Sequence, residues 1–356
     1  MSPRRVLALV AIGVVAAGCS ATNGSSSPAG STSLAPTTIT LLTHDSFDVS
    51  KPVLQAFEDQ TGITVKIVAV GDAGELANRL ILDAGNPEGD VAFGIDNDQL
   101  ADLFAHEVFT PYTPERLDAV PQQYSAWDPE HRVTPIDHGE VCVNDDLAAY
   151  TSRPAPTSLD DLANPSYQGQ LVVENPATSS PGLAFLLATV AGYGDPGYLD
   201  YWQRLKDNGV TVVDGWERAY FGEFSGAGGG DGTHPLVVSY ATSPVAEVYY
   251  ADPPIAKAPT GVLTDTCYAQ VEFAGVLAGT DHPEAAQAFI DFLLSKPFQD
   301  DIPLRMFVSP VSAEAKPPNV FRQFAVPVSL PYSLPPDQVA AHRADWVSAW
   351  ADVMGQ

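Results

Sequence analysis

Apolar segments of strand length alternate with segments of helical periodicity from residue 38 onward. Residues 39–42, 63–70 and 91–93 are short and rich in apolar, largely β-branched side chains, which predicts strands. Residues 53–59 and 75–84, which lie between them, place apolar side chains at helical spacing. Strands that alternate with helices predict an α/β fold with a largely parallel sheet.

The rest of the chain repeats this alternation. Strands are predicted at 171–173, 210–213, 236–240 and 268–273, and helices at 181–191, 198–208, 216–224, 244–250, 283–294, 297–302 and 336–354. We expect a two-lobed α/β fold in which each lobe is a mostly parallel sheet flanked by helices. Lobe 1 comprises residues 37–140 and 268–356, and lobe 2 comprises residues 141–267. Linker strands near residues 136–143 and 262–270 cross between the lobes.

Residues 1–19 have the pattern of an export signal. Arg4 and Arg5 precede an apolar run at 6–17 that is too short to span a bilayer, and small residues follow it. The end of this segment, Ala17-Gly18-Cys19, resembles a bacterial lipobox, in which the signal is cleaved before the cysteine and the thiol is acylated. An ordinary signal peptide with a chance cysteine is the alternative.

If this segment is a lipobox, the mature protein is predicted to lie on the outer face of the cytoplasmic membrane. Residues 1–18 are then a removed signal peptide, and Cys19 holds the lipid anchor. Residues 19–36 are rich in Ser, Gly, Thr and Pro, which predicts a flexible tether.

The net charge of the chain narrows the classes of molecule that it can bind. The formal net charge is −27, which makes nucleic acid and anionic lipid headgroups poor partners and favours cationic ligands.

Besides Cys19, the chain contains only Cys142 and Cys267. They fall on the two predicted linkers, and such a pair in an exported protein predicts a disulfide. Free buried thiols and a catalytic cysteine are the alternatives.

Polar loops follow the predicted strands of lobe 1. His44 follows the first strand, Asp72 and Ala73 follow the second, and residues 96–98 follow the third. Ligands of open α/β sheets bind beyond the carboxyl ends of the strands, so we expect these loops to meet at one edge. Asp72 is a candidate countercharge for a cation, and an aspartate in a surface turn is the alternative.

Lobe 2 offers a helix start and an aromatic face. Ser179 and Ser180 precede a proline and an apolar helix, a pattern typical of an N-cap, whose free amides can also bind a phosphate or hydroxyl group. Trp216 and Tyr220 are four residues apart and share one face of a short helix, and Tyr240 ends a strand just before another hydroxyl-capped helix. Such aromatic residues suit a cationic ligand, and burial in the core is the alternative.

Several other chemistries have weak support. The glycine-rich run at 226–232 lacks the Gly-Lys-Ser/Thr ending of a phosphate loop, the seven histidines show no metal-ligand spacing, and no Gly-x-Ser-x-Gly elbow occurs. Tyr249 and Tyr250 are adjacent, as in ferric-ion receptors of similar architecture.

Segments along nearly the whole mature chain resemble the periplasmic thiamine-binding proteins, the receptors of thiamine ABC importers, which are extracellular solute-binding proteins similar to type II. The matching segments are Asp45-Ser46-Phe47, 78–80, 94–97, Thr178-Ser179-Ser180-Pro181-Gly182-Leu183, Gly215-Trp216-Glu217-Arg218-Ala219-Tyr220, Ser239-Tyr240-Ala241-Thr242-Ser243-Pro244, 270–272, 297–299 and 339–346. No single motif is specific, but their order and spacing together are.

The resemblance implies a monomeric receptor with a periplasmic-binding-protein fold, no enzymatic activity and no cofactor. Its ligand would be thiamine or a thiamine phosphate, and its partner a membrane ABC permease. An aspartate matching Asp72 faces the charged or amino groups of the ligand in this family, and aromatic residues matching Trp216 and Tyr220 or Tyr240 line the pocket. Ser179 lies where a phosphate or hydroxyethyl tail would end.

The chain departs from the family pattern at three positions. His44 stands where the family usually has Tyr, Phe307 where Trp is expected, and Ala246 where an aromatic residue is expected. A precursor of thiamine is therefore an alternative ligand. The alternatives from other classes are a thiaminase-like enzyme that uses Cys142 and a receptor that holds ferric ion, or another small solute, with Tyr249 and Tyr250.

Overall fold

A computed structural model describes residues 36–228 and 231–356. The predicted signal peptide, Cys19 and the predicted tether up to residue 35 lie outside the described residues. Among the helices that are described, none is both long enough and apolar enough to cross a membrane.

One mixed sheet runs through both lobes. Its strands follow the spatial order β2-β1-β3-β9-β5-β8-β6-β7, and β4 and β10 pair with β9 and β5. The strands are β1 (Thr37–Thr43), β2 (Ile63–Ala69), β3 (Val91–Asp96), β4 (Phe109–Thr110), β5 (Thr134–Asp146), β6 (Leu171–Glu174), β7 (Thr211–Val213), β8 (Leu236–Tyr240), β9 (Thr260–Leu277) and β10 (Ser309–Pro310). We call the part around β1–β4 and β10 lobe 1 and the part around β6–β8 lobe 2. Within each lobe the pairs β1·β2, β1·β3, β6·β7 and β6·β8 are parallel, which confirms the predicted fold class.

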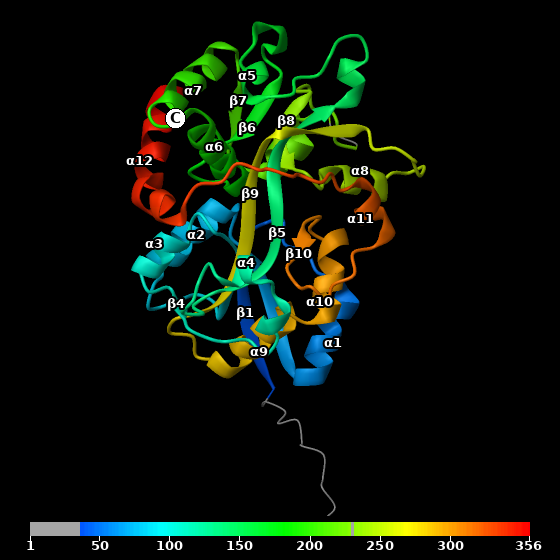
Figure 1. The fold of residues 1–356 in the computed structure, drawn as a ribbon. Coiled ribbons are helices and arrows are strands. Elements are labelled where there is room, and N and C mark those ends of the chain that lie inside the picture. The colour runs from blue at the N-terminus through cyan, green and yellow to red at the C-terminus, as the bar shows by residue number, and fades with distance from the viewer. Residues whose placement is uncertain (1–35, 229–230) are drawn as a thin grey trace, which may run out of the picture. The chain divides into compact units, whose positions relative to one another are not determined.

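The long strands β5 and β9 link the lobes. They pair antiparallel from Thr134↔Ala274 to Asp146↔Thr260, and Figure 1 shows them side by side between the lobes. In the middle of this ribbon a disulfide joins Cys142 and Cys267, both fully buried. The covalent bond therefore lies within the linker itself.

The helices cover both faces of the sheet. They are α1 (Lys51–Thr61), α2 (Ala73–Leu82), α3 (Leu100–Ala105), α4 (Gln122–Ser125), α5 (Leu159–Leu162), α6 (Ser180–Tyr193), α7 (Gly197–Asp207), α8 (Ser243–Tyr249), α9 (Pro283–Leu293), α10 (Lys296–Asp301), α11 (Asn319–Phe324) and α12 (Pro336–Met354), with a short π-helical turn, η4 (Arg218–Glu223). In lobe 1, Ile39 and Leu41 of β1 pack toward α9, whereas Leu42 packs toward α2. Burial on both faces explains why these strands are almost continuously apolar.

The C-terminal helix corrects the predicted domain boundary. We assigned residues 268–356 to lobe 1, but α12 packs on lobe 2, where Trp350 lies edge-on to Trp202 of α7 with ring centroids 5.5 Å apart. The preceding segment returns along the linker, where Tyr332 N donates to Cys267 O at 2.7 Å. The assignment was wrong for this helix because its apolar stripe fits either lobe, and only the return path decides between them.

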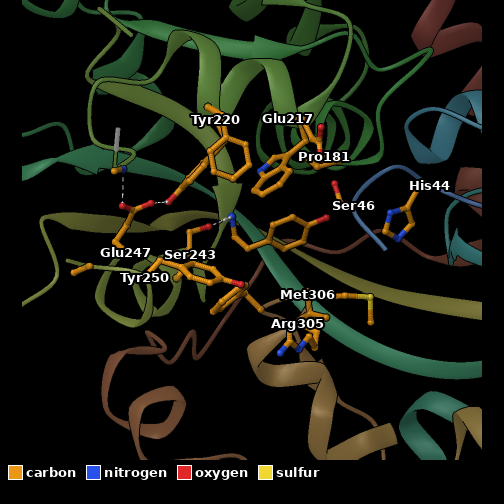
Figure 2. A pocket seen from close by; sticks show the side chains of 18 of the residues that line it. His44, Ser46, Pro181, Glu217, Tyr220, Ser243, Glu247, Tyr250, Arg305 and Met306 are labelled. Atoms are coloured by element: carbon orange, nitrogen blue, oxygen red, sulfur yellow. Dashed lines mark hydrogen bonds between the residues drawn. The ribbon is translucent and has the colours of Figure 1, made fainter. Parts of the chain in front are cut away.

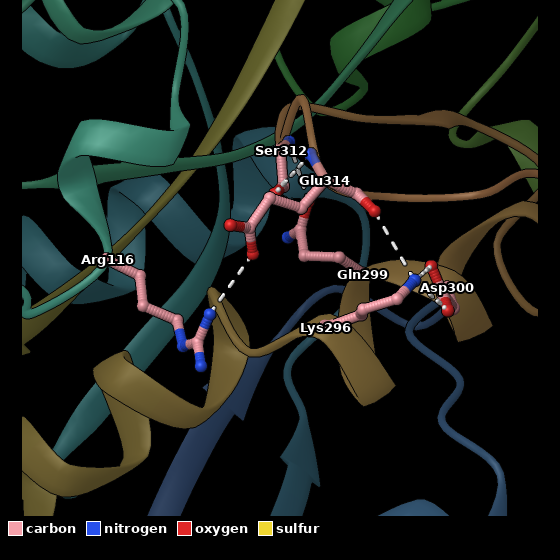
Figure 3. A network of polar contacts seen from close by, with 6 residues as sticks. All are labelled: Arg116, Lys296, Gln299, Asp300, Ser312 and Glu314. Atoms are coloured by element: carbon pink, nitrogen blue, oxygen red, sulfur yellow. Dashed lines mark hydrogen bonds and ion pairs between the residues drawn. The ribbon is translucent and has the colours of Figure 1, made fainter.

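A buried glutamine fixes the segment that follows Phe307 onto lobe 1 (Figure 3). Gln299 is fully buried, and its Nε2 donates to Ile136 O at 2.9 Å and to Leu293 O at 2.8 Å, while its Oε1 accepts from Ser312 N at 3.0 Å. Lys296 pairs with Asp300 beside it on the surface at 2.6 Å.

Replacing Gln299 with leucine is expected to lower the free energy of unfolding by about 2–3 kcal/mol, because three buried backbone groups lose their partners. Chemical denaturation measures this loss. The matched control is Lys296→Ala, which removes a half-exposed ion pair of the same network and should cost under about 1 kcal/mol. Equal effects of the two substitutions would contradict the role given to Gln299.

Candidate functional site

A cavity of about 680 Å³ lies between the lobes (Figure 2). Lobe 1 lines it with His44, Ser46, Asp72, Ala73, Glu272, Arg305, Met306, Phe307 and Val308, and lobe 2 lines it with Ser180, Pro181, Trp216, Glu217, Tyr220, Phe221, Gly228, Tyr240, Ser243, Ala246, Glu247, Tyr250, Ala251, Asp252, Pro253, Ile255 and Pro259. All of the predicted ligand-binding residues except Ser179 therefore line one cavity, whose size is typical of small-molecule sites.

Asp72 joins the two lobes at the edge of this cavity. It is the N-cap of α2, and its Oδ1 accepts from Ala73 N at 2.6 Å. The same carboxylate accepts from two backbone amides of lobe 2, Ser180 N at 3.4 Å and Trp216 N at 3.0 Å. Burial raises the pKa of Asp72, and the amide hydrogen bonds oppose that rise. Asp72 is thus not the aspartate of a surface turn but a contact between the lobes.

Aromatic side chains form the lobe 2 wall. Trp216 and Tyr220 are stacked with ring centroids 5.1 Å apart, as their spacing predicts, and Tyr240 lies edge-on to Trp216 at 6.3 Å. Trp216 Nε1 donates to Ser239 Oγ at 2.9 Å, and Tyr220 OH donates to Glu247 Oε1 at 2.9 Å. Trp216 is half-buried, whereas Tyr220 is buried behind it. The indole therefore presents the accessible face of the pair.

The two serines at the start of α6 have different positions. Ser180 lines the cavity, and its Oγ accepts from Gln270 Nε2 at 2.9 Å. Ser179 is the N-cap residue, but its side chain makes no capping hydrogen bond, and it lies behind the cavity surface at 1% exposure. The prediction that a ligand tail ends at Ser179 is therefore not supported by its position, whereas Ser180 is accessible from the cavity.

Buried acidic groups form the lobe 1 floor. Glu272 lines the cavity with His44, whose Nε2 lies 3.6 Å from Glu272 Oε1, and Asp137 is fully buried behind them. Burial raises the pKa values of both Glu272 and Asp137. The charge of Asp137 adds to the rise at Glu272, whereas at Asp137 the hydrogen bond with Glu272 opposes the rise. Asp96, a hydrogen-bond partner of Gln270, has a raised pKa because of its burial and the nearby charge of Glu272. This floor favours protons or cationic groups.

His44 is held neutral by burial, which lowers its pKa to about 4 despite the nearby Asp45 charge. The unfolded chain takes up the proton near pH 6.5, so the stability that His44 contributes is complete above that pH and is lost as the pH falls toward 4. Between pH 7 and pH 4.5 the wild type should lose roughly 2–3 kcal/mol more unfolding free energy than His44→Gln. Chemical denaturation at the two pH values measures the difference, and equal losses would contradict it.

Phe307 reaches the cavity from a strained loop. Its φ is 55°, a left-handed conformation that is costly for a bulky residue and tends to occur at functional sites. Its ring lies 5.5 Å from that of Tyr250, at the end of α8 on the other lobe. Phe307 and Tyr250 therefore form an aromatic contact between the lobes in the lining of the cavity.

Several lining residues were not predicted as ligand contacts. Glu272 is an acid within the otherwise apolar end of β9, and such a charge inside a buried strand is a usable signal. Glu217 and Glu247 lie on short helical segments where acids are common, and Arg305 and Met306 lie in a loop without a motif. Nothing in the local sequence distinguishes these four.

The geometry also bears on the two alternative chemistries. Cys142 is bonded to Cys267, so the bonded form has no thiolate that could attack a substrate. Tyr249 and Tyr250 are both exposed, with ring centroids 5.0 Å apart. Within residues 36–228 and 231–356, no group of three or more His, Cys, Asp or Glu side chains is arranged to hold a metal ion.

Comparison with known proteins shows extensive similarity. A family model described as bacterial extracellular solute-binding protein matches residues 90–325. The thiamine-binding periplasmic proteins of Salmonella typhimurium and Escherichia coli are each 32% identical to the chain, over 88% of it and 92% of their own length. A solved structure of a periplasmic thiamin binding protein matches with a TM-score of 0.78 at 30% identity, covering 90% of this chain and 96% of the other.

Proposed function

Because the chain belongs to the bacterial extracellular solute-binding proteins, and within them to the thiamine-binding periplasmic proteins, we propose that it captures thiamine outside the cytoplasmic membrane for an ABC import permease. It is a binding protein and not an enzyme. The observation that supports thiamine most is the cavity between the lobes, with stacked aromatic rings on one side and acidic groups on the other.

The chemistry of thiamine matches this cavity at three points. Its thiazolium ring is a flat cation, which suits the accessible face of Trp216, since a desolvated cation–π contact is worth about 2 kcal/mol. Its aminopyrimidine ring carries donors and acceptors that suit His44 and Glu272. Its hydroxyethyl tail ends in a hydroxyl group, which can form a hydrogen bond with the side chain of Ser180 or Ser243. These residue roles are proposals.

We propose that the protein captures thiamine by closing its two lobes around it. The hydrogen bonds from Ser180 N and Trp216 N to Asp72 form only when the lobes are together, and so does the contact of Phe307 with Tyr250. Ligand can drive closure only by as much as it prefers the closed state. Thiamine between Trp216 and the acidic floor touches both lobes and therefore supplies that preference.

Isothermal titration calorimetry of the purified mature protein tests the proposal. We expect one thiamine to bind per chain, with no turnover of thiamine when an amine nucleophile is added. Release of thiazole would instead favour the thiaminase-like alternative, and a coloured protein as isolated would favour ferric-ion capture through Tyr249 and Tyr250. Absence of any thiamine binding would overturn the proposed ligand.

We also propose that Cys19 carries a lipid anchor, which keeps the receptor near its permease. Acylation adds hydrophobic area that holds the protein on the bilayer. Membrane fractionation of cells that express the whole chain tests this anchor. The wild type should sediment with membranes and Cys19→Ala should not; a wild type that remains in the soluble fraction would contradict the anchor.

A further inference from the structure

We propose that three buried carboxyl groups in the floor of the cavity, Asp96, Glu272 and Asp137, form a proton-binding site, and that thiamine displaces a proton from this site into solvent when it binds. We call these three side chains the acid row. The inference rests on the proposed function and adds a second, linked ligand to it, the proton. It is supported by the register of the sheet, by the hydrogen bonds of the row and by the charges around it.

The sheet register places the three acids next to one another. Asp96 of β3 and Asp137 of β5 are both cross-strand partners of Glu272 in β9. Such partners project to the same face of a sheet, and adjacent strands lie about 4.8 Å apart. All three side chains are buried, Asp137 completely. Because like charges directly opposite one another are destabilising, the fold disfavours a row of three ionised carboxylates.

The row has few of the hydrogen-bond donors that stabilise ionised carboxylates. Asp96 Oδ1 accepts from Gln270 Nε2. Among the described residues, no N–H group donates to either oxygen of Asp137, although both oxygens are buried. A hydrogen bond nevertheless links Asp137 and Glu272, and a hydrogen bond between two carboxyl groups requires a proton on one of them. The row therefore holds at least one proton.

The groups that face Glu272 supply no positive charge. His44 Nε2 lies 3.6 Å from Glu272 Oε1 without a hydrogen-bond partner among the described residues, and His44 is neutral because burial lowers its pKa to about 4. Asp72 adds negative charge, and Tyr240 is a neutral phenol whose pKa is raised by burial. Arg305 is the one lysine or arginine of the lining within the described part of the chain, and its guanidinium lies 3.2 and 3.9 Å from two carboxylates of its own lobe.

A ligand cation changes this balance. Glu272 is the member of the row that lines the cavity, so it is the one that a bound cation can approach. An opposite charge within about 4–6 Å lowers the pKa of a carboxyl group by about 1–3. The O–H bond of one acid then breaks, its proton passes to the buffer, and the carboxylate that remains attracts the cation. The row thus stays protonated in the empty cavity and supplies a countercharge when the ligand arrives.

Calorimetry of thiamine binding in two buffers of different ionisation enthalpy counts the released protons. At pH 7 the wild type should release about half a proton to one proton per thiamine, so its affinity should rise about threefold to tenfold per pH unit between about pH 6 and pH 7.5. In Glu272→Gln, thiamine should bind at least about threefold more weakly, and the release should fall by at least about half.

Asp137→Asn distinguishes proton linkage from damage to the site. Asp137 lies behind the lining, so this substitution removes no ligand contact, and it takes a like charge away from Glu272. Glu272 is then ionised before thiamine arrives. The variant should release at most about half as many protons as the wild type, yet bind thiamine at pH 6 at least as tightly. Weaker binding at every pH with the wild-type release would indicate a structural role instead.

The matched control is Asp252→Asn, which removes an exposed acid of the lining outside the acid row and should keep the wild-type number of released protons. Melting temperatures of the three variants check that each is folded. Wild-type protein that binds thiamine without releasing a proton would overturn this inference alone. Unchanged release in both Glu272→Gln and Asp137→Asn would overturn the role of the acid row, and failure of the wild type to bind thiamine would overturn the proposed function together with the inference.

Discussion

Replacing Trp216 with alanine is expected to weaken thiamine binding by at least about tenfold, and by about thirtyfold if a full cation–π contact is lost. The indole is the accessible member of the stacked pair with Tyr220, and it is fixed from behind by the bond from its Nε1 to Ser239 Oγ. Its removal leaves the thiazolium cation against a void on the lobe 2 side.

The matched control for this prediction is Trp216→Phe. Phenylalanine keeps an aromatic face but cannot donate to Ser239, so it should retain more affinity than alanine does. Calorimetry of both variants, together with their melting temperatures, separates binding from folding. An unchanged dissociation constant for Trp216→Ala would remove this residue from the site, and equal losses in the two variants would assign the effect to the Ser239 bond instead of the aromatic face.

Replacing both Cys142 and Cys267 with alanine is expected to lower the free energy of unfolding by about 2–4 kcal/mol. The two residues are 125 positions apart, and a closed loop of that length restricts the unfolded chain strongly. The chain-entropy argument alone sets an upper value of about 5 kcal/mol. Because both sulfurs are buried in the ribbon of β5 and β9, the loss acts on the connection between the lobes.

The control for the disulfide prediction is to compare the wild type and the double variant with and without a reductant. Dithiothreitol should lower the denaturation midpoint of the wild type toward that of the double variant, and it should leave the double variant unchanged. Intact-mass measurement with thiol labelling should find no free Cys142 or Cys267 in the exported protein. Two free thiols, or equal stability of wild type and double variant, would contradict the structural role.

The sequence pattern was sufficient for the fold class and for most elements. The strands after which His44 and Asp72 lie are short apolar runs bounded by polar loops, and a parallel sheet brings such loops together. The helix start at Ser180 and the Trp216–Tyr220 face were equally visible, since a proline after hydroxyl residues and an i,i+4 aromatic pair are local signals.

What the sequence could not supply depends on contacts between distant segments. The partners of Asp72 lie 108 and 144 residues away, so its use as a contact between lobes has no local signature. The placement of α12 on lobe 2 depends on the return of the chain along the linker. The left-handed backbone of Phe307 likewise has no local signature, and it lies five residues before Ser312, whose amide donates to the distant Gln299.

Native mass spectrometry of the protein purified from its exported form, without refolding, tests the central claim most directly. A receptor whose lobes close on thiamine should retain part of its ligand, so we expect a second species heavier than the free protein by the mass of thiamine or a thiamine phosphate, and conversion of all protein to a ligand-bound form when thiamine is added. Protein that stays free of ligand after thiamine is added, or that carries a different solute which thiamine does not displace, would contradict the account.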